Sequence, residues 1–250
     1  MGIIPCCLWV IAAGLAAMAG PPAQVDERGV AFPVTVTPPG GGRSHHLTGA
    51  ATRERTIFKV DVYAYALYLE PDAARAHLVA FAGRPAPAID RDRSFYARLL
   101  EMRIPMMLRL VTTRDLAGDQ LRDAFDDALQ PRVARAAVEL KMPGGDAALA
   151  RFRGYFSPGE LPRGTTIVFA CGDGRLTTSV NAELRPALVS PALCWALFDA
   201  YLGDRAISTV GRRRLVAGIP ALLANAPSPQ PAHRGGASGV AAGGVQSRSG

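Results

Sequence analysis

Arg53 and Tyr63 are the two residues of this 250-residue chain whose types and spacing suit the binding of an anion. The guanidinium of Arg53 offers a planar fork of donors that matches a carboxylate, and the phenol of Tyr63 can add a hydrogen bond beside it. On one straight strand the two side chains would lie about 33 Å apart, at roughly 3.3 Å per residue. A turn near Phe58-Lys59 would instead place them opposite each other across an antiparallel pair, with Cβ atoms about 5 Å apart. No Gly, Asn or Pro marks that turn, so an exposed strand arginine beside a core-edge tyrosine remains the alternative.

The residues around Tyr63 would give this anion site an apolar floor. An alkyl chain buried on them would gain about 0.8 kcal/mol per methylene, so a long tail could supply most of the affinity while Arg53 fixes its orientation. The pattern indicates a ligand with an anionic head and an apolar body. The floor residues are Val60, Val62, Ala64, Ala66 and Leu67.

The basic charge of the chain does not indicate a nucleic-acid partner. The net charge is +7, but the arginines are scattered among acids and no dense basic run is interleaved with aromatics. The run Arg212-Arg213-Arg214 is typical of a solvated helix face, with an anionic membrane surface as the alternative. Hydrolase, dinucleotide-binding and P-loop motifs are absent. We therefore expect no nucleic acid among the partners and no cofactor.

The cysteines and histidines show no spacing typical of a metal site. Cys6 and Cys7 lie in an apolar leader, which leaves Cys171 and Cys194 for the folded body, too few for a disulfide framework. Cys194 is expected to be a small core residue. The adjacent pair His45-His46 suits a polar loop better than a metal site. No metal is expected.

The two ends of the chain differ in composition from its middle. Residues 1–19 are predicted to be an apolar leader of the cleaved, secretory type, so no stable membrane span is expected in the mature protein. Residues 20–44 are rich in Pro and Gly and are predicted to be a linker or an edge loop. Residues 225–250 are rich in Pro, Ser, Gly and Ala and are predicted to be a disordered tail.

Residues 45–224 are predicted to form one α+β domain. Residues 56–69 and 104–112 have the composition of strands, and residues 165–171 and 175–181 form a hairpin around Gly172-Asp173-Gly174. From Leu116 the apolar residues recur at helical spacing, and Pro131 is expected to kink or split that helix. Ser190-Pro191 and Gly203 bracket a further helix, and a last one covers roughly residues 210–223. This order predicts an antiparallel sheet covered on one face by helices.

Five segments between Leu47 and Leu223 also follow one another in a specific order. They are LTGAATRERTIF, KVDVYAYALYLE, MMLRLVTTRD with LRDAFDDALQPRV, FSPGELPRGTTIVF ending at TTSVN, and SPALCWALFDAYLGDRAIS. In these segments the chain resembles the chalcone isomerase family, and within it the fatty-acid-binding, chalcone-isomerase-like branch. The resemblance implies the open-faced β-sandwich of that family, with a ligand cleft between a curved antiparallel sheet and a layer of helices.

The resemblance leaves more than one function open. True isomerases of the family carry an arginine at the position of Arg53, a threonine at that of Tyr63, and a tyrosine, lysine and asparagine along a stretch that matches residues 116–125, which here reads LAGDQLRDAF. The fatty-acid-binding branch matches at both positions and holds a fatty-acid carboxylate there. The resemblance thus implies that Arg53 and Tyr63 bind a fatty acid or similar apolar anion, with no catalytic residues and a role in fatty acid metabolism or storage. The alternatives are a chalcone isomerase and a non-enzymatic regulator of a biosynthetic enzyme.

The resemblance and the leader differ in where they would locate the protein. Fatty-acid-binding relatives are plastid proteins, whereas the first 19 residues have a secretory character. We take the plastid as the expectation from resemblance. A monomer is expected.

Overall fold

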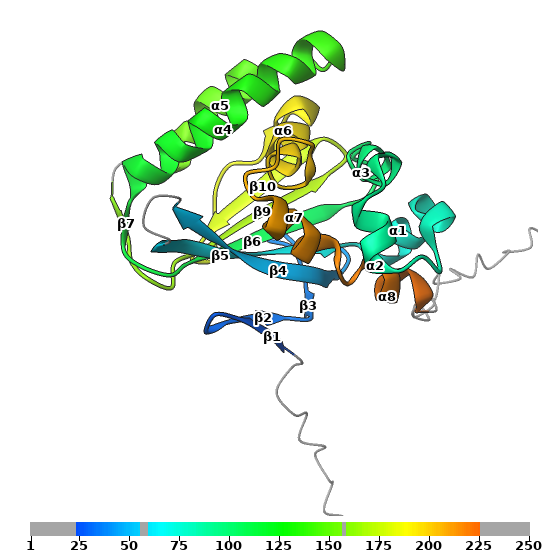
Figure 1. Cartoon of the computed structure of the whole chain (residues 1–250). Coiled ribbons are helices and arrows are strands. Elements are labelled where there is room, and N and C mark those ends of the chain that lie inside the picture. Colours follow the sequence, from blue (N-terminus) through cyan, green and yellow to red (C-terminus); the bar gives the residue numbers. More distant parts are fainter. Residues whose placement is uncertain (1–23, 56–59, 157–158, 226–250) are drawn as a thin grey trace, which may run out of the picture.

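The computed structural model describes residues 24–55, 60–156 and 159–225. Within them the main element is a curved antiparallel sheet in the order β11-β10-β9-β6-β5-β4-β3, with β12 paired to β10. Helices cover one face of this sheet (Figure 1), so the predicted α+β class with an open-faced sandwich is confirmed. The strands of this sheet are β3 (Thr35–Val36), β4 (His45–Arg55), β5 (Val60–Leu69), β6 (Met106–Thr112), β9 (Thr166–Gly172), β10 (Arg175–Val180), β11 (Glu183–Leu184) and β12 (Leu188–Val189).

Strands β4 and β5 form the antiparallel pair that the anion site requires. Their register places Arg53 opposite Tyr63, which confirms the predicted pairing. The expected turn at Phe58-Lys59 lies outside the described residues. Side chains of β5 alternate between the two faces, so Tyr63 and Tyr65 belong to the core on the helix side and Tyr68 to a smaller cluster on the other side. Ala64 and Ala66 lie in that smaller cluster, so the expectation that they form a floor beside Tyr63 is wrong.

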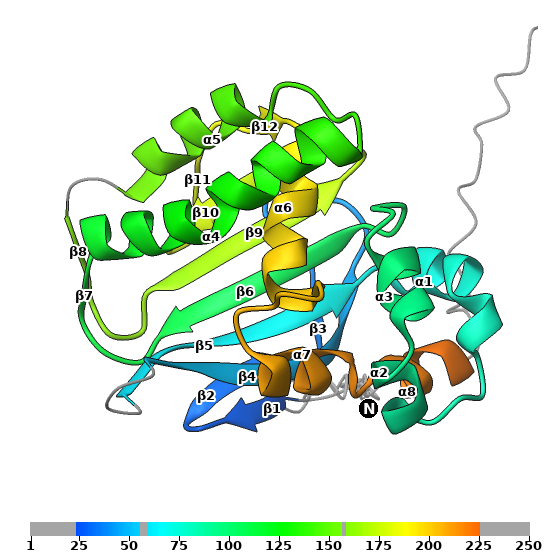
Figure 2. The same cartoon turned by 45° about the horizontal axis from the view of Figure 1, so that its top comes forward.

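Three helices, α4 (Gly118–Glu139), α5 (Gly145–Arg153) and α6 (Pro191–Leu202), cover the helix side of the sheet (Figure 2). In α6 every residue after Pro191 is buried, as expected for a helix that is apolar all round. Its predicted ends are confirmed. The Ser190 hydroxyl accepts a hydrogen bond from the Leu193 N–H at 3.1 Å, and Gly203 is the C-cap.

Helix α4 runs through Pro131 as one element, so of the expected kink or split at this proline the split is wrong. A proline inside a helix costs about 3 kcal/mol, because it removes one hydrogen bond and crowds the preceding turn. The core contacts of α4 offset this cost, since Leu129 and Val133 on either side of the proline are fully buried. Tertiary packing therefore overrides the local preference.

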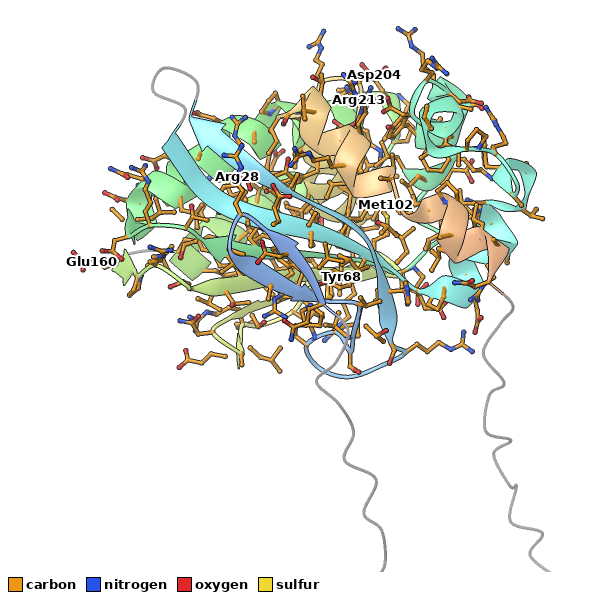
Figure 3. All side chains as sticks on the ribbon, turned by 60° about the horizontal axis from the view of Figure 1, so that its bottom comes forward. Arg28, Tyr68, Met102, Glu160, Asp204 and Arg213 are labelled. Carbon is orange, nitrogen blue, oxygen red and sulfur yellow. A yellow bond between two sulfur atoms is a disulfide. The ribbon has the colours of Figure 1, made fainter. Side chains whose placement is uncertain are left out.

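The N-terminal segment covers part of the other face of the sheet. Strands β1 (Gln24–Glu27) and β2 (Val30–Pro33) form a hairpin, and β3 extends the sheet by pairing with β4. Phe32 is fully buried in one cluster with Tyr68, and Figure 3 shows Tyr68 beside this hairpin. The expectation of a linker or edge loop over residues 20–44 is therefore corrected for the described part. The side chain of Phe32 in β2 is buried because it packs against this face of the sheet.

The remaining helices follow β5 and α6 along the chain. Between β5 and β6 lie α1 (Pro71–His77), the 3-10 helix η1 (Val79–Phe81), α2 (Ala86–Asp90) and α3 (Arg93–Leu99). The predicted final helix is two helices, α7 (Thr209–Val216) and α8 (Ile219–Ala224), separated at Gly218. A short pair, β7 (Leu116–Ala117) with β8 (Glu160–Leu161), and the 3-10 helix η2 (Gly154–Phe156) flank α4 and α5.

A disulfide bond joins the sheet to the helix layer. It links Cys171 at the end of β9 to Cys194 in the first turn of α6, and both residues are buried. The expectation that Cys194 lies in the core is confirmed, but the sequence pattern gave no reason to pair it. The predicted hairpin between β9 and β10 brings Cys171 to this position, with Asp173 and Gly174 at φ of 52° and 71° in the turn.

Candidate functional site

A cavity of about 680 Å³ lies between the sheet and the helices α4 and α6. Its volume falls within the 300 to 1,000 Å³ that is typical of small-molecule sites, about the size that holds one drug-sized ligand. Both residues predicted from the sequence, Arg53 and Tyr63, line it. The other lining residues include Val62, Leu116, Leu121, Ala124, Phe125, Ala128, Leu129, Leu197, Ala200, Tyr201 and Ile207.

Arg53 is half-buried at the wall formed by β4. Its Nη1 donates a hydrogen bond to the backbone carbonyl of Ile207 at 2.5 Å. Ile207 belongs to the loop that joins α6 to α7 and follows Arg53 by 154 positions in the sequence. This hydrogen bond therefore fixes the guanidinium to a distant segment of the chain. A guanidinium has five N–H donors, and this contact therefore orients the side chain without exhausting it.

Tyr63 lies in the cavity beside Tyr201 of α6. The two hydroxyl groups are 3.2 Å apart and form a hydrogen bond that either can donate. The ring of Tyr65 contacts both, with centroid distances of 5.8 Å to Tyr63 and 5.1 Å to Tyr201. Burial raises the pKa of Tyr63 above its ordinary value of 10.0, and the hydrogen bond from Tyr201 and the charge of Arg53 oppose this rise. Tyr63 therefore keeps its proton near neutral pH and can donate to an anion.

Tyr201 is the member of this site that the sequence reasoning missed. It is one of eleven consecutive buried residues of α6, so its periodicity carries no sign of function. Tyr201 follows Tyr63 by 138 positions in the sequence, so no local pattern predicts their contact. The phenol of a buried tyrosine usually needs a hydrogen-bond partner, and that requirement is the one clue available from sequence.

Helix α4 gives the cavity a partly apolar wall. Leu121 and Phe125 are buried and lie on this wall. Phe125 belongs to an aromatic cluster in which its ring meets Phe152, Phe156 and Phe169 at centroid distances of 5.3 to 5.7 Å. Gln120, Asp123 and Asp127 of the same helix line the cavity as well, so this wall is apolar only in part.

Charged side chains also line the cavity, namely Arg114, Arg132 and Arg205 with Asp123 and Asp127. One of them, Arg132, is held between helices. Its Nε donates to the buried carboxylate of Asp199 at 3.0 Å, and Arg135 donates to the same carboxylate at 2.9 Å while its guanidinium stacks 4.6 Å from the Trp195 ring. This network ties α4 to α6 and so fixes two walls of the cavity relative to each other. In the residues that the structure describes, no group of His, Cys, Asp or Glu could hold a metal ion.

Comparison with known proteins agrees with this geometry. A family model described as "Chalcone isomerase like" matches residues 43–216. The chain belongs to the chalcone isomerase-like family. Since the match extends from the start of β4 to the end of α7, it includes Arg53, Tyr63 and Tyr201.

The relatives of the chain fall into two functional groups. A chalcone–flavanone isomerase of Oryza sativa is 28% identical over 212 residues, covering 80% of this chain and 90% of the relative. Fatty-acid-binding protein 2 of Arabidopsis thaliana is 31% identical over 195 residues, covering 74% of this chain and 48% of the relative. The crystal structure of the Arabidopsis fatty-acid-binding protein AtFAP1 superposes with a TM-score of 0.66 at 26% identity, covering 80% of this chain and 99% of that one. Similarity alone therefore does not separate catalysis from binding.

Within the described residues, none of the helices combines the length and the apolar composition needed to cross a membrane.

Proposed function

We propose that this protein is a non-catalytic carrier of fatty acids, in which Arg53 and Tyr63 hold the carboxylate and the cavity between the sheet and α4 holds the acyl chain. The observation that supports this proposal best is that both side chains line one cavity and lie opposite each other on paired strands. A charged fork and a neutral phenol beside it suit a carboxylate. A role in fatty acid metabolism or storage would follow.

The apolar part of the α4 wall supports binding in preference to catalysis. Ring closure of a chalcone needs groups that move or stabilise charge at the reacting atoms, and Leu121, Ala124 and Phe125 offer none beside the position of an acyl chain. The groups that could stabilise charge, such as Arg53, lie elsewhere in the lining. An acyl chain gains from the same surface, at about 0.8 kcal/mol per buried methylene. The half-buried Arg53 would then contribute orientation and selectivity for an acid over an ester or alcohol.

The proposal is tested by the lipid that the protein carries. The purified protein is extracted with organic solvent, the extract is analysed by mass spectrometry, and affinity for a long-chain fatty acid is measured by calorimetry. We expect a bound fatty acid that is lost in Arg53→Ala, with affinity reduced by about 2 kcal/mol, roughly 30-fold, as for a hydrogen bond to a charged group. Arg109→Ala is the matched control, because Arg109 extends from β6 on the opposite face of the sheet.

Two outcomes would contradict the proposal. Equal fatty-acid affinity in the wild type and in Arg53→Ala would remove Arg53 from the head-group site. Acceleration of chalcone closure by the purified protein, abolished by Arg53→Ala, would show that the protein is an isomerase.

A further inference from the structure

A second cavity, of about 890 Å³, shares no lining residue with the first. Its lining residues come from α2, the start of α3, the loop after α6 and the first part of α7. Its apolar residues are Ala86 and Pro87, and most of the others are charged. In Figure 3 the labelled Asp204 and Arg213 lie together at this edge of the molecule.

Arginines outnumber acids in this cavity. Arg91, Arg93, Arg212 and Arg213 line it together with Asp90 and Asp204. The expectation that Arg212-Arg213-Arg214 is merely a solvated helix face is therefore incomplete, because two of its members contribute to a concave site. The cavity carries a net positive charge.

One arginine of the cavity is held rigidly. The guanidinium of Arg212 stacks 4.5 Å from the centre of the Tyr96 ring, and its Nη1 donates to the carbonyl of Gly203 at 3.2 Å. Its Nε is buried and has no hydrogen-bond partner among the described residues. A fixed guanidinium with an unused donor loses little conformational freedom when it meets an anion.

The acids of the cavity neutralise only part of this charge. Asp90 accepts a hydrogen bond from the Tyr96 hydroxyl at 2.8 Å and lies 3.7 Å from the Nε of Arg213. The exposed side chains of Arg91 and Arg93 form no ion pair or side-chain hydrogen bond with any residue that the structure describes. Two arginines of the concave surface thus have no ion-pair partner among the described residues, and Asp204, the other acid of the cavity, leaves its net charge positive.

We propose that this second cavity binds a phosphate group, carried either by a small phosphorylated molecule or by a phospholipid head. Guanidinium groups match phosphate oxygens in pairs, and a doubly charged phosphate balances two unpaired arginines where a single carboxylate would not. Charged side chains form the majority of its lining, so we expect the phosphate to supply most of the affinity. The site is independent of the fatty-acid site, and its failure would leave the proposed function untouched.

Inorganic pyrophosphate is the probe for the first source. Its binding to the full chain is measured by calorimetry for the wild type and for the double variant Arg91→Gln/Arg93→Gln. We expect saturable binding that weakens about tenfold or more in the variant, since two charge-assisted contacts are removed. Both side chains are exposed, so the variant should keep its fold, which a thermal melt checks.

Binding to vesicles tests whether a phospholipid carries the phosphate. Cosedimentation compares vesicles of phosphatidylcholine with vesicles that also contain phosphatidic acid, whose head is a phosphomonoester. Binding that requires phosphatidic acid and is lost in Arg91→Gln/Arg93→Gln supports the site with a lipid as the source of the phosphate. Binding of pyrophosphate with the same loss supports a soluble ligand.

The control variant is Arg151→Gln/Arg163→Gln, which removes the same charge from exposed positions on α5 and after β8. Absence of binding to both probes overturns the proposal. An equal loss of binding in the control variant also overturns it, because general surface attraction would then explain the affinity.

Discussion

At the scale of single residues, the hydrogen bond between Tyr63 and Tyr201 decides which phenol proton a ligand can use. When a carboxylate accepts from Tyr63, the oxygen of Tyr63 can still accept from Tyr201, so the two phenols form a chain that ends at the anion. In the proposed complex Arg53 would bind the same carboxylate from the neighbouring strand. Tyr201 lies on α6, and Ile207, which binds Arg53, lies in the loop that follows α6. The positions of Arg53, Tyr63 and Tyr201 therefore all depend on this part of the chain.

Replacing Tyr63 by Phe should weaken fatty-acid binding modestly. We expect a loss of about 0.5 to 1.5 kcal/mol, the usual contribution of one hydrogen bond, measured by calorimetry. Tyr201→Phe should cost less, because in the proposed complex Tyr201 acts on the carboxylate through its hydrogen bond to Tyr63. Unchanged affinity in Tyr63→Phe would remove this residue from the site.

His45 should make folding stability depend on pH. Its ring is buried, and its Nδ1 donates to the carbonyl of Arg43 at 2.9 Å. Burial lowers the pKa of His45 from 6.5, opposed by that hydrogen bond and by Glu70. In the unfolded chain the ring binds a proton near pH 6.5, whereas the folded chain resists it. The contribution of His45 to the free energy of unfolding is therefore complete above pH 6.5. It is lost as the pH falls through the lower pKa of the folded state.

Urea unfolding on either side of pH 6.5 measures this effect. The free energy of unfolding should fall toward acid in the wild type, and this slope should be reduced in His45→Gln, which keeps a polar side chain without a titrating group. Identical slopes in both proteins would show that His45 does not cause the dependence.

At the scale of elements, α7 packs directly on the backbone of β4. The Thr48 hydroxyl donates to the carbonyl of Leu215 at 2.7 Å, and the Gly218 N–H donates to the carbonyl of Thr48 at 2.7 Å. A Cβ added at Gly49 would lie 1.9 Å from the carbonyl oxygen of Arg214. Only glycine allows this approach, which also fixes the loop that carries Ile207 to Arg53.

Gly49→Ala should therefore destabilise the fold. Overpacking of this kind costs about 1 to 3 kcal/mol or more, because backbone and not a flexible side chain must move. Urea unfolding measures the loss. Gly154→Ala is the control, since a Cβ there meets nothing within 4 Å. Equal stability of the two variants would mean that α7 adjusts without cost.

Local chemistry in the sequence predicted some elements and not others. The hairpin after Cys171 was predictable because Asp173-Gly174 marks its turn, and α6 because Ser190 and Gly203 mark its ends. The pairing of Arg53 with Tyr63 could be predicted only as one of two alternatives, since its turn carries no such mark. Strands β1 to β3 and the partner of Tyr63 depend on contacts between distant segments, which no local pattern encodes.

At the scale of the whole molecule, the disulfide between Cys171 and Cys194 should add to stability. It closes a loop with a sequence separation of 23, which in the chain-entropy model corresponds to about 3 kcal/mol. Reduction of the wild type should lower the free energy of unfolding by about this amount in urea titrations. The variant Cys171→Ala/Cys194→Ala should not respond to reductant. A wild type that is equally insensitive would show that the bond contributes nothing.

The stability that this disulfide adds depends on the redox state of the compartment, because the bond persists only where it is not reduced. Disulfides form and persist in secretory, periplasmic and extracellular spaces, whereas glutathione and thioredoxin keep thiols reduced in the cytosol. We therefore expect the folded chain to accumulate in an oxidising compartment, an expectation that rests on the disulfide and differs from the plastid expected from resemblance. Alkylation of cell fractions before and after reduction checks this, because oxidised Cys171 and Cys194 take up the label only after reduction. Such a carrier would meet its fatty acids outside the cytosol, among lipids that are being exported, taken up or released from membranes.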